Sequence, residues 1–134
     1  MTSRVTYTGD LRTLSVHLQS GKEFITDAPV DNHGLGQAFS PTDTVANAVA
    51  TCMLTVMGIK ARAMGVDITG ATAEVTKTMA SDPRRISKVE VSLSLPAGIS
   101  GKDRKILEHT GKTCPVIQSI NPAIEKELEF HWVL

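Results

Sequence analysis

The sequence has no excess of charge of either sign. Lysine and arginine together number 14, as do aspartate and glutamate, and no basic run stands out. An electrostatic footprint for nucleic acid or anionic lipid is therefore missing, and we expect neither nucleic acid nor a membrane as a partner. Internal repeats, low-complexity tracts and Pro/Gly-rich linkers are also missing. With 41% hydrophobic and 21% charged residues, the chain is expected to form a single globular domain over residues 1–134.

Two further absences concern location and redox state. The N-terminus, MTSRVTYTGD, lacks the charged-then-apolar pattern of a signal peptide, and we expect no apolar run long enough to cross a bilayer. A cytoplasmic location is predicted. The only cysteines, Cys52 and Cys114, then lie in a reducing compartment, where a transient redox pair is more usual than a permanent disulfide. On number alone, two unrelated buried thiols are the commoner alternative.

The first forty residues predict a small sheet and a loop. Residues 3–9 and 12–20 form strands around the turn Gly9-Asp10, and residues 23–26 add a third strand. Residues 28–40 then form a loop rich in glycine, asparagine and aspartate. Its length suggests a role at a binding site.

A long central helix is predicted to follow. Ser40 suits the N-cap and Pro41 the first helical position. Asp43, three residues after the cap, can complete a capping box. The helix is expected to run to Met64, with Gly65 in the position that follows a helix end.

Apolar residues cover almost the whole surface of this helix. The stripe that contains the first cysteine has helical spacing and consists of Val45, Val49, Cys52, Val56, Ile59 and Ala63. A second stripe beside it consists of Ala46, Ala50, Met53 and Met57. Such a helix must be covered on nearly all sides, and the other elements of one chain are too few to do so. We therefore expect a homodimer in which two such helices pack together.

The second half of the sequence predicts a hairpin, two short helices and a last strand. The hairpin joins residues 66–80 to residues 85–96, with Val89, Val91, Leu93 and Leu95 facing inward. Ser100 caps a helix over residues 101–109, Cys114-Pro115 begins another, and residues 124–133 form the final strand. The order of these elements indicates an α+β fold with an antiparallel sheet.

Each cysteine has a functional and a structural interpretation. Cys114 lies at a predicted helix start, where free N–H groups and the helix dipole favour a thiolate, although it could equally just pack there. Cys52 has no charged neighbour on its own helix face, so a charge must come from another element. Arginine suits this role because it stays charged when buried and can donate two hydrogen bonds to an anion. Arg12 is such a candidate, although in isolation it resembles a solvated strand residue.

Metal binding and acyl transfer have weaker support. His109 lies five positions before Cys114, but a metal site needs three or four converging ligands. A cysteine hydrolase needs a base held against its thiol and a third group that orients the base. Neither pattern is present, and we favour redox chemistry.

Several segments resemble the OsmC/Ohr family of osmotically induced and organic hydroperoxide resistance proteins. They are Ala38-Phe39-Ser40-Pro41-Thr42-Asp43, the cysteine eleven positions after the proline, and Cys114-Pro115-Val116. The stretches YTGDLR at 7–12 and TDAPVDN at 26–32 are similar to its OsmC-like branch. The resemblance spans essentially the whole chain. It implies an OsmC-like fold in an intertwined homodimer, in which outer sheets enclose the paired helices and each active site uses residues of both chains.

The resemblance also implies an activity in the oxidative stress response. It indicates a thiol peroxidase that reduces organic hydroperoxides and, less well, hydrogen peroxide, without a metal or organic cofactor. By position, Cys52 matches the peroxidatic cysteine, Cys114 the resolving cysteine and Arg12 the arginine that stabilises the thiolate. A sulfenic acid on Cys52 would condense with Cys114 to a disulfide, which a dithiol or small-thiol reductant would then reduce.

One position departs from the family pattern. Hydroperoxidases of this family have a glutamate immediately after the proline, where it can orient the arginine, and this sequence has Thr42. Asp43 is a poor substitute because, at about 100° per residue, it points about 180° away from Cys52 around the helix axis. Asp10 and Asp31 are the acidic residues that we consider for holding Arg12.

A second hypothesis belongs to another class of protein. The chain could form a non-catalytic OsmC-like dimer that binds a small apolar ligand in an interface pocket, with the cysteines as lining residues. Met53, Val56 and Met57 would form its walls. A co-purified lipid-like ligand that a Cys52→Ser variant still binds would favour this hypothesis.

The apolar central helix generates a first testable prediction. Light scattering of the purified protein should give about twice the 14.4 kDa mass of one chain, because pairing two chains buries helix surface that one chain leaves in water. The mass of a single chain would contradict the predicted helix pairing.

Overall fold

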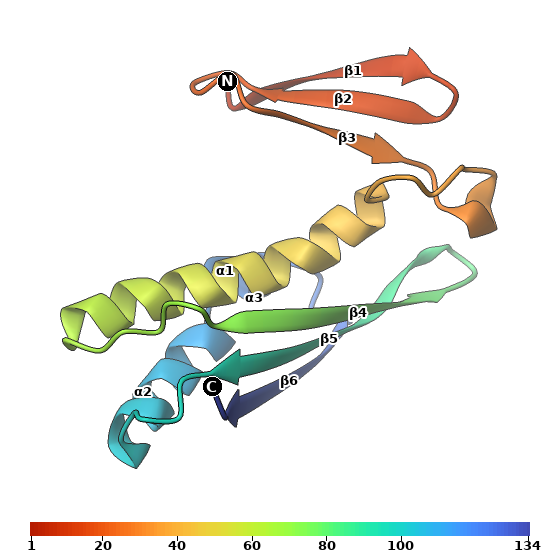
Figure 1. Ribbon diagram of the computed structural model, residues 1–134. Helices are drawn as coiled ribbons and strands as arrows, with labels where there is room; N and C mark the ends of the chain where they lie inside the picture. The colour runs from red at the N-terminus through yellow and green to blue at the C-terminus, as the bar shows by residue number, and fades with distance from the viewer. The chain divides into compact units, whose positions relative to one another are not determined.

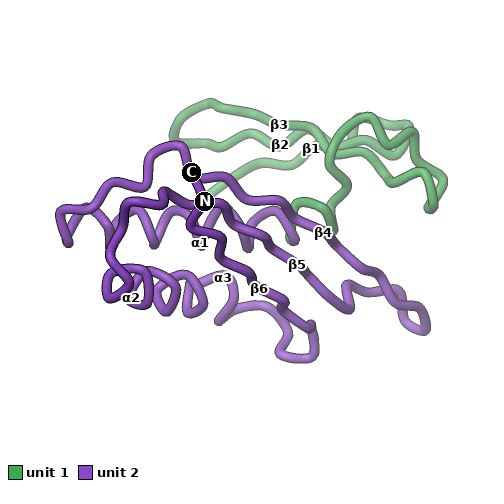
Figure 2. Tube along the Cα trace, turned by 60° about the horizontal axis from the view of Figure 1, so that its bottom comes forward, with its two compact units in different colours: residues 1–45 green, residues 46–134 purple.

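A computed structural model describes all residues, 1–134, and its Cα positions group into two compact units. Met1–Val45 form the first unit and Ala46–Leu134 the second (Figure 2). The boundary falls inside the central helix. The expectation of a single domain stays a prediction.

The elements follow one another in the predicted order (Figure 1). The first unit contains β1 (Ser3–Gly9), β2 (Arg12–His17), β3 (Glu23–Asp27) and the 3-10 helix η1 (Val30–Asn32). The central helix α1 (Pro41–Ala63) leads into the second unit, which also contains β4 (Thr72–Ala80), β5 (Arg85–Leu95), α2 (Gly101–Lys112), α3 (Pro115–Ser119) and β6 (Glu125–Trp132). The predicted α+β class is confirmed. β2 and β4 are shorter than predicted, and α2 is longer.

The first sheet has the order β1-β2-β3 and is antiparallel throughout. Its first turn places Asp10 and Leu11 at φ values of 54° and 61°, as in the type I′ turns that match the twist of hairpins. Leucine rarely adopts this left-handed conformation. The N–H of Leu11 donates to the Tyr7 hydroxyl at 3.3 Å, and the Thr8 hydroxyl donates to the Arg12 carbonyl at 3.2 Å. These two hydrogen bonds, both within the hairpin, stabilise its turn.

Helix α1 begins with the predicted capping box. The N–H of Asp43 donates to Ser40 Oγ at 3.0 Å, and the N–H of Ser40 donates to Asp43 Oδ2 at 3.0 Å. Two N–H groups that the first turn of a helix leaves unpaired are therefore satisfied. The Thr42 hydroxyl lies 3.2 Å from Ser40 Oγ and joins the same group.

The end of α1 is a Schellman motif around the predicted glycine. Gly65 has a φ of 71°, a value that favours glycine. The N–H of Gly65 donates to the Arg62 carbonyl at 3.2 Å, and the N–H of Val66 donates to the Ala61 carbonyl at 2.8 Å. These bonds satisfy carbonyls of the last turn, and α1 stops at Ala63.

The face of α1 that is most buried differs from the one predicted as the main apolar stripe. The buried residues are Ala46, Val49, Ala50, Met53, Met57 and Ala61. On the stripe of Cys52, Val45 is 40% exposed and Ile59 is 66% exposed. The chain therefore covers the second apolar stripe more fully than the first.

The core of the second unit lies between its helices and one face of the β4–β6 sheet. Val89, Val91, Leu93 and Leu95 alternate inward along β5, as predicted, and all are buried. Helix α2 packs against β6 through aromatic contacts. The Arg104 guanidinium lies 5.4 Å from the centre of the Trp132 ring, whose Nε1–H donates to the Glu108 carboxylate at 2.9 Å.

The predicted antiparallel arrangement is correct for β4 and β5 but wrong for β6. Residues Lys88 to Leu95 pair with Glu125 to Trp132 in parallel. The reason is that α2 and α3 lie between β5 and β6 in the chain. Two parallel neighbours need such a crossover, because a tight turn can join only antiparallel strands.

Helix α1 also corrects the expectation about membrane spans. By length and composition alone it is apolar enough to cross a bilayer. Core helices of soluble proteins meet the same criteria. Met53 and Met57 are buried, and 33% of the apolar window of α1 is buried within this chain.

The capping box generates a prediction about stability. Ser40→Ala should lower the free energy of unfolding by about 1 kcal/mol, because the N–H of Asp43 loses its acceptor. Urea unfolding measures this change. The control is Ser81→Ala in the exposed turn between β4 and β5, which should leave stability nearly unchanged. Equal stability of the two variants would contradict the role of the cap.

Candidate functional site

Two thiols that are far apart in sequence are neighbours in the second unit. Cys52 lies on α1 and is half-buried, whereas Cys114, the N-cap of α3, is 1% exposed. The Cys52 side chain is one of the groups that shift the pKa of Cys114, as expected for neighbouring thiols. Both thiols belong to the same apolar cluster.

The start of α3 favours a thiolate at Cys114, as expected from the sequence, but burial has the larger and opposite effect. Burial is the largest influence and raises the pKa of the thiol above its ordinary value of 9.0. The neighbouring Cys52 raises it further. Backbone hydrogen bonds from Ile117 and Val116 act in the predicted, lowering direction but are outweighed. Cys114 is therefore held as a neutral thiol at neutral pH.

A close helix contact explains how Cys114 reaches α1. Gly111, near the end of α2, lies so near α1 that a Cβ atom there would be 2.8 Å from Met57 Sδ. Three residues later, the N–H of Cys114 donates to the Gly111 carbonyl at 3.3 Å. Pro115 then occupies the first turn of α3, where its missing N–H costs nothing. The tight end of α2 thus brings the second thiol to the helix that bears the first.

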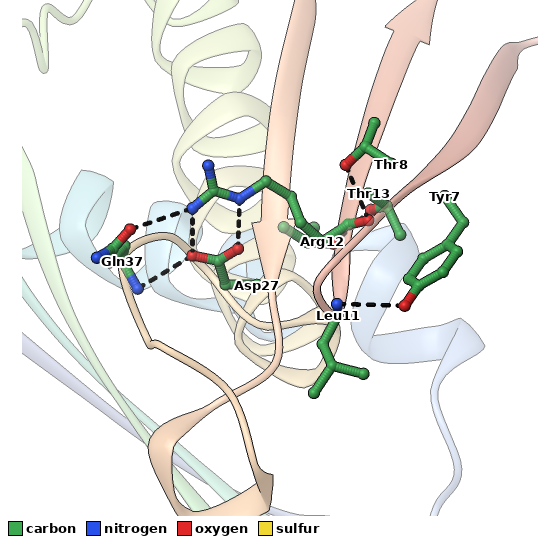
Figure 3. A network of polar contacts seen from close by, with 8 residues as sticks. Tyr7, Thr8, Leu11, Arg12, Thr13, Asp27 and Gln37 are labelled. Carbon is green, nitrogen blue, oxygen red and sulfur yellow. Dashed lines mark hydrogen bonds and ion pairs between the residues drawn. The ribbon is translucent and has the colours of Figure 1, made fainter.

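The first unit contains a buried carboxylate paired with Arg12. Arg12 Nε donates to Asp27 Oδ1 at 2.6 Å, and Nη2 donates to Oδ2 at 2.8 Å (Figure 3). The Asp27 side chain is 3% exposed and that of Arg12 is 35% exposed. Such a bidentate pair fixes the plane of the guanidinium as well as its position.

Each partner of this pair stabilises the charged form of the other. Hydrogen bonding to Asp27 raises the pKa of Arg12 above its ordinary value. Hydrogen bonding from Arg12 holds the pKa of Asp27 below its ordinary value of 3.8, although burial opposes this. The ion pair is therefore intact at neutral pH and is lost only as the pH falls through the lowered pKa of Asp27.

Strand register and the following loop build this cluster. Arg12 begins β2, Asp27 ends β3, and the two residues are direct partners across the strands. The loop then folds back over Ala28, where a Cβ on Gly34 would collide with the Ala28 carbonyl oxygen. This path of the loop places Gln37 next to the ion pair of Arg12 and Asp27. Its N–H donates to Asp27 Oδ2 at 3.1 Å, and its Oε1 accepts from Arg12 Nη2 at 3.3 Å.

Asp27 is the functional candidate that the sequence analysis missed. Arg12 is held by Asp27, whereas Asp10 acts on it only as a more distant charge and Asp31 lies in η1. The predicted third strand stopped one residue short of Asp27. The signal that could have found it is the position of an aspartate at the end of the strand paired with β2.

No three His, Cys, Asp or Glu side chains converge as possible ligands of a metal ion. Of the residues considered for such a site, His109 lies on α2 and is exposed, while Cys114 is buried.

The fold and the thiols define a class, an α+β protein with one cysteine on a long apolar helix and a second, buried cysteine near it. The family model of OsmC-like proteins matches residues 34–129. The chain therefore belongs to the OsmC-like protein family. No curated protein sequence matches it significantly.

Solved structures share this fold over nearly the whole chain. A protein from Psychrobacter arcticus, provisionally described as an osmotic stress induced and detoxification response protein, is 56% identical with a TM-score of 0.94, covering 98% of this chain and 96% of its own. An organic hydroperoxide resistance protein from Legionella pneumophila is 14% identical with a TM-score of 0.76, with coverages of 98% and 97%. OhrB of Bacillus subtilis, also an organic hydroperoxide resistance protein, is 17% identical with a TM-score of 0.70, with coverages of 97% and 98%.

The environment of Cys114 generates a prediction about its reactivity. In a Cys52→Ser variant, the pH midpoint for alkylation of Cys114 by iodoacetamide should lie above 9.0, because burial, the largest influence, remains. Peptide mass spectrometry measures the modification at each pH. The same variant unfolded in urea is the control and should show an ordinary thiol midpoint. A native midpoint at or below that of the unfolded chain would contradict the dominant effect of burial on Cys114.

Proposed function

We propose that this protein is a thiol-dependent peroxidase that reduces organic hydroperoxides and, less well, hydrogen peroxide. The observation that carries the proposal is that Cys52 and Cys114 are neighbours in the same apolar cluster. Two neighbouring thiols can exchange between dithiol and disulfide with less movement of the chain than distant ones. The names of the Legionella and Bacillus structures support the choice of an organic hydroperoxide as substrate.

In the first step, Cys52 acts as the nucleophile. Its thiolate attacks the terminal oxygen of the hydroperoxide, a sulfur–oxygen bond forms and the O–O bond breaks. The leaving alkoxide takes up a proton and departs as an alcohol, while Cys52 becomes a sulfenic acid. The peroxide gains two electrons, both from the sulfur.

In the second step, Cys114 resolves the sulfenic acid. The sulfur of Cys114 attacks that of Cys52, a disulfide forms, and the departing hydroxide leaves as water with the proton of the Cys114 thiol. An external dithiol or small thiol then reduces the disulfide by exchange and is itself oxidised. Because Cys114 is neutral in the resting protein, it does not compete with Cys52 for peroxide.

Arg12 completes the proposed chemistry. A guanidinium can hold the Cys52 thiolate and offset the charge that develops on the leaving oxygen. We propose that Arg12 has this role within a homodimer, where either chain could supply it. The ordered, charged state of Arg12 beside Asp27 supports the role.

The homodimer is part of the proposal. Val45 and Ile59 on α1 are exposed, and so are Val5, Tyr7 and Phe24 on the first sheet. A three-stranded sheet needs a covered apolar face to be stable, and a second copy of the chain would supply the cover. Members of this family are generally dimeric and soluble. We place the reaction in the cytoplasm, where thiol reductants are available.

The burial of two expected wall residues argues against the alternative, a non-catalytic dimer that binds a small apolar ligand. Met53 and Met57, two of the three expected wall residues, are fully buried in the core of their own chain. They cannot line an open pocket without a rearrangement of that core. The observations therefore favour the peroxidase.

The proposed function predicts different defects in the two cysteine variants. With cumene hydroperoxide and a dithiol reductant, Cys52→Ser should reduce peroxide no faster than buffer with the reductant alone, because the nucleophile is missing. Cys114→Ser, the matched control with the same chemical change, should still consume about one equivalent of peroxide per chain, as expected for a sulfenic acid on Cys52. A coupled assay of peroxide loss measures both.

Three results would contradict the proposal. The first is that both thiols of the wild type remain titratable after excess peroxide. The second is that Cys52→Ser is as active as the wild type. A lipid-like ligand bound equally by the wild type and Cys52→Ser, without peroxide consumption, would support the non-catalytic alternative.

A further inference from the structure

The contacts of Arg12 leave one end of its guanidinium free. The group has five N–H donors, on Nε, Nη1 and Nη2. Nε and Nη2 bind the two oxygens of Asp27, and Nη2 also binds Gln37. Nη1 has no partner in the chain, and Figure 3 shows it pointing away from the carboxylate. The two N–H donors of Nη1 are therefore available to an anion.

The carboxylate that holds Arg12 is itself fixed. Asp27 Oδ2 accepts the backbone N–H of Gln37, and the N–H of Asp27 donates to the Phe39 carbonyl at 3.1 Å. With its side chain 3% exposed, Asp27 has little freedom to follow a moving arginine. On the other side, Arg12 follows Leu11, whose φ of 61° is rare for leucine and is held by Tyr7. Strained residues of this kind are concentrated at functional sites.

The start of α1 offers no competing carboxylate. Thr42 occupies the position of the family glutamate, and its hydroxyl lies with Ser40 at the helix cap. Asp43, the acidic residue of the first turn of α1, takes part in the capping box. The side chains that accept from Arg12 are Asp27 and Gln37. A carboxylate from β3 is thus the group that contacts the arginine.

We propose that Asp27 is the positioning residue of the site, which holds Arg12 through Nε and Nη2 so that Nη1 is presented to the sulfur or peroxide oxygen. The inference rests on the proposed function. It makes Asp27 the replacement for the carboxylate absent at Thr42. Loss of Asp27 would leave Arg12 charged but free to rotate, so the thiolate would lose a fixed partner.

The test compares Asp27→Asn with Asp10→Asn, both in Cys114→Ser protein so that Cys52 is the only thiol. Asp10→Asn removes the same charge near Arg12 without touching it, and asparagine tolerates the positive φ of position 10. The pH profile of Cys52 alkylation gives the thiolate midpoint. Stopped-flow consumption of one equivalent of cumene hydroperoxide gives the second-order rate constant.

Asp27→Asn should raise the thiolate midpoint and lower the rate constant by about 10- to 100-fold, the loss expected when a catalytic group is misplaced. Asp10→Asn should match the parent. In an Arg12→Ala background, Asp27→Asn should have no further effect on either quantity, because Asp27 acts through Arg12. A merely structural role would give the same loss in both backgrounds.

The outcomes separate the two proposals. If the parent consumes peroxide and Asp27→Asn behaves like Asp10→Asn, the positioning role is overturned and the peroxidase stands. If the parent consumes no peroxide but Asp27→Asn still shifts the Cys52 midpoint, the peroxidase is overturned and the positioning role stands.

A measurement on the wild type covers the case in which Asp27→Asn does not fold. By NMR, the Arg12 Nε–H proton should exchange slowly at neutral pH and shift as Asp27 titrates below 3.8. Rapid exchange of this proton would overturn the positioning role.

Discussion

Burial of α1 is the constraint on which the thiol site depends. Its inner face packs against the β4–β6 sheet and α2, and α2 comes close to Met57 of α1 at Gly111. That contact brings Cys114 to Cys52 and removes Cys114 from water. The same burial raises the pKa of Cys114, and no cation is among the groups that shift it. These apolar surroundings suit a hydrophobic peroxide but give a thiolate no charged partner. In the proposed mechanism, the charge comes from Arg12, and Asp27 fixes its orientation.

Local sequence signals predicted the main elements well. The caps of α1 depend on residues within one turn of each end, Ser40 with Asp43 and Gly65, and both have the expected geometry. The alternation along β5 also identified its buried face. The direction of β6 relative to β5 could not be predicted from this pattern, because apolar and polar residues alternate in the same way in parallel and antiparallel strands. It depends on the crossover through α2 and α3.

Prediction of the site was limited by contacts between distant residues. The positions of the two cysteines and of Arg12 in the sequence identified them as candidate site residues. The pKa of Cys114, however, depends on burial by other elements, and this effect is larger than that of the backbone hydrogen bonds at the start of α3. Asp27 was missed because hairpin register decides which residue faces Arg12. A tight turn between residues 20 and 23 would place residue 31 opposite Arg12. The second strand in fact ends at His17, and the register moves to Asp27.

The most direct test of the account is the redox state of the two cysteines after reaction. Reduced wild-type protein is treated with one equivalent of cumene hydroperoxide, digested without reductant and mapped by mass spectrometry. The proposed mechanism predicts a single peptide pair in which Cys52 is joined to Cys114, and its loss when a dithiol is added. Two unmodified cysteines, or oxidation of Cys114 while Cys52 stays reduced, would contradict it.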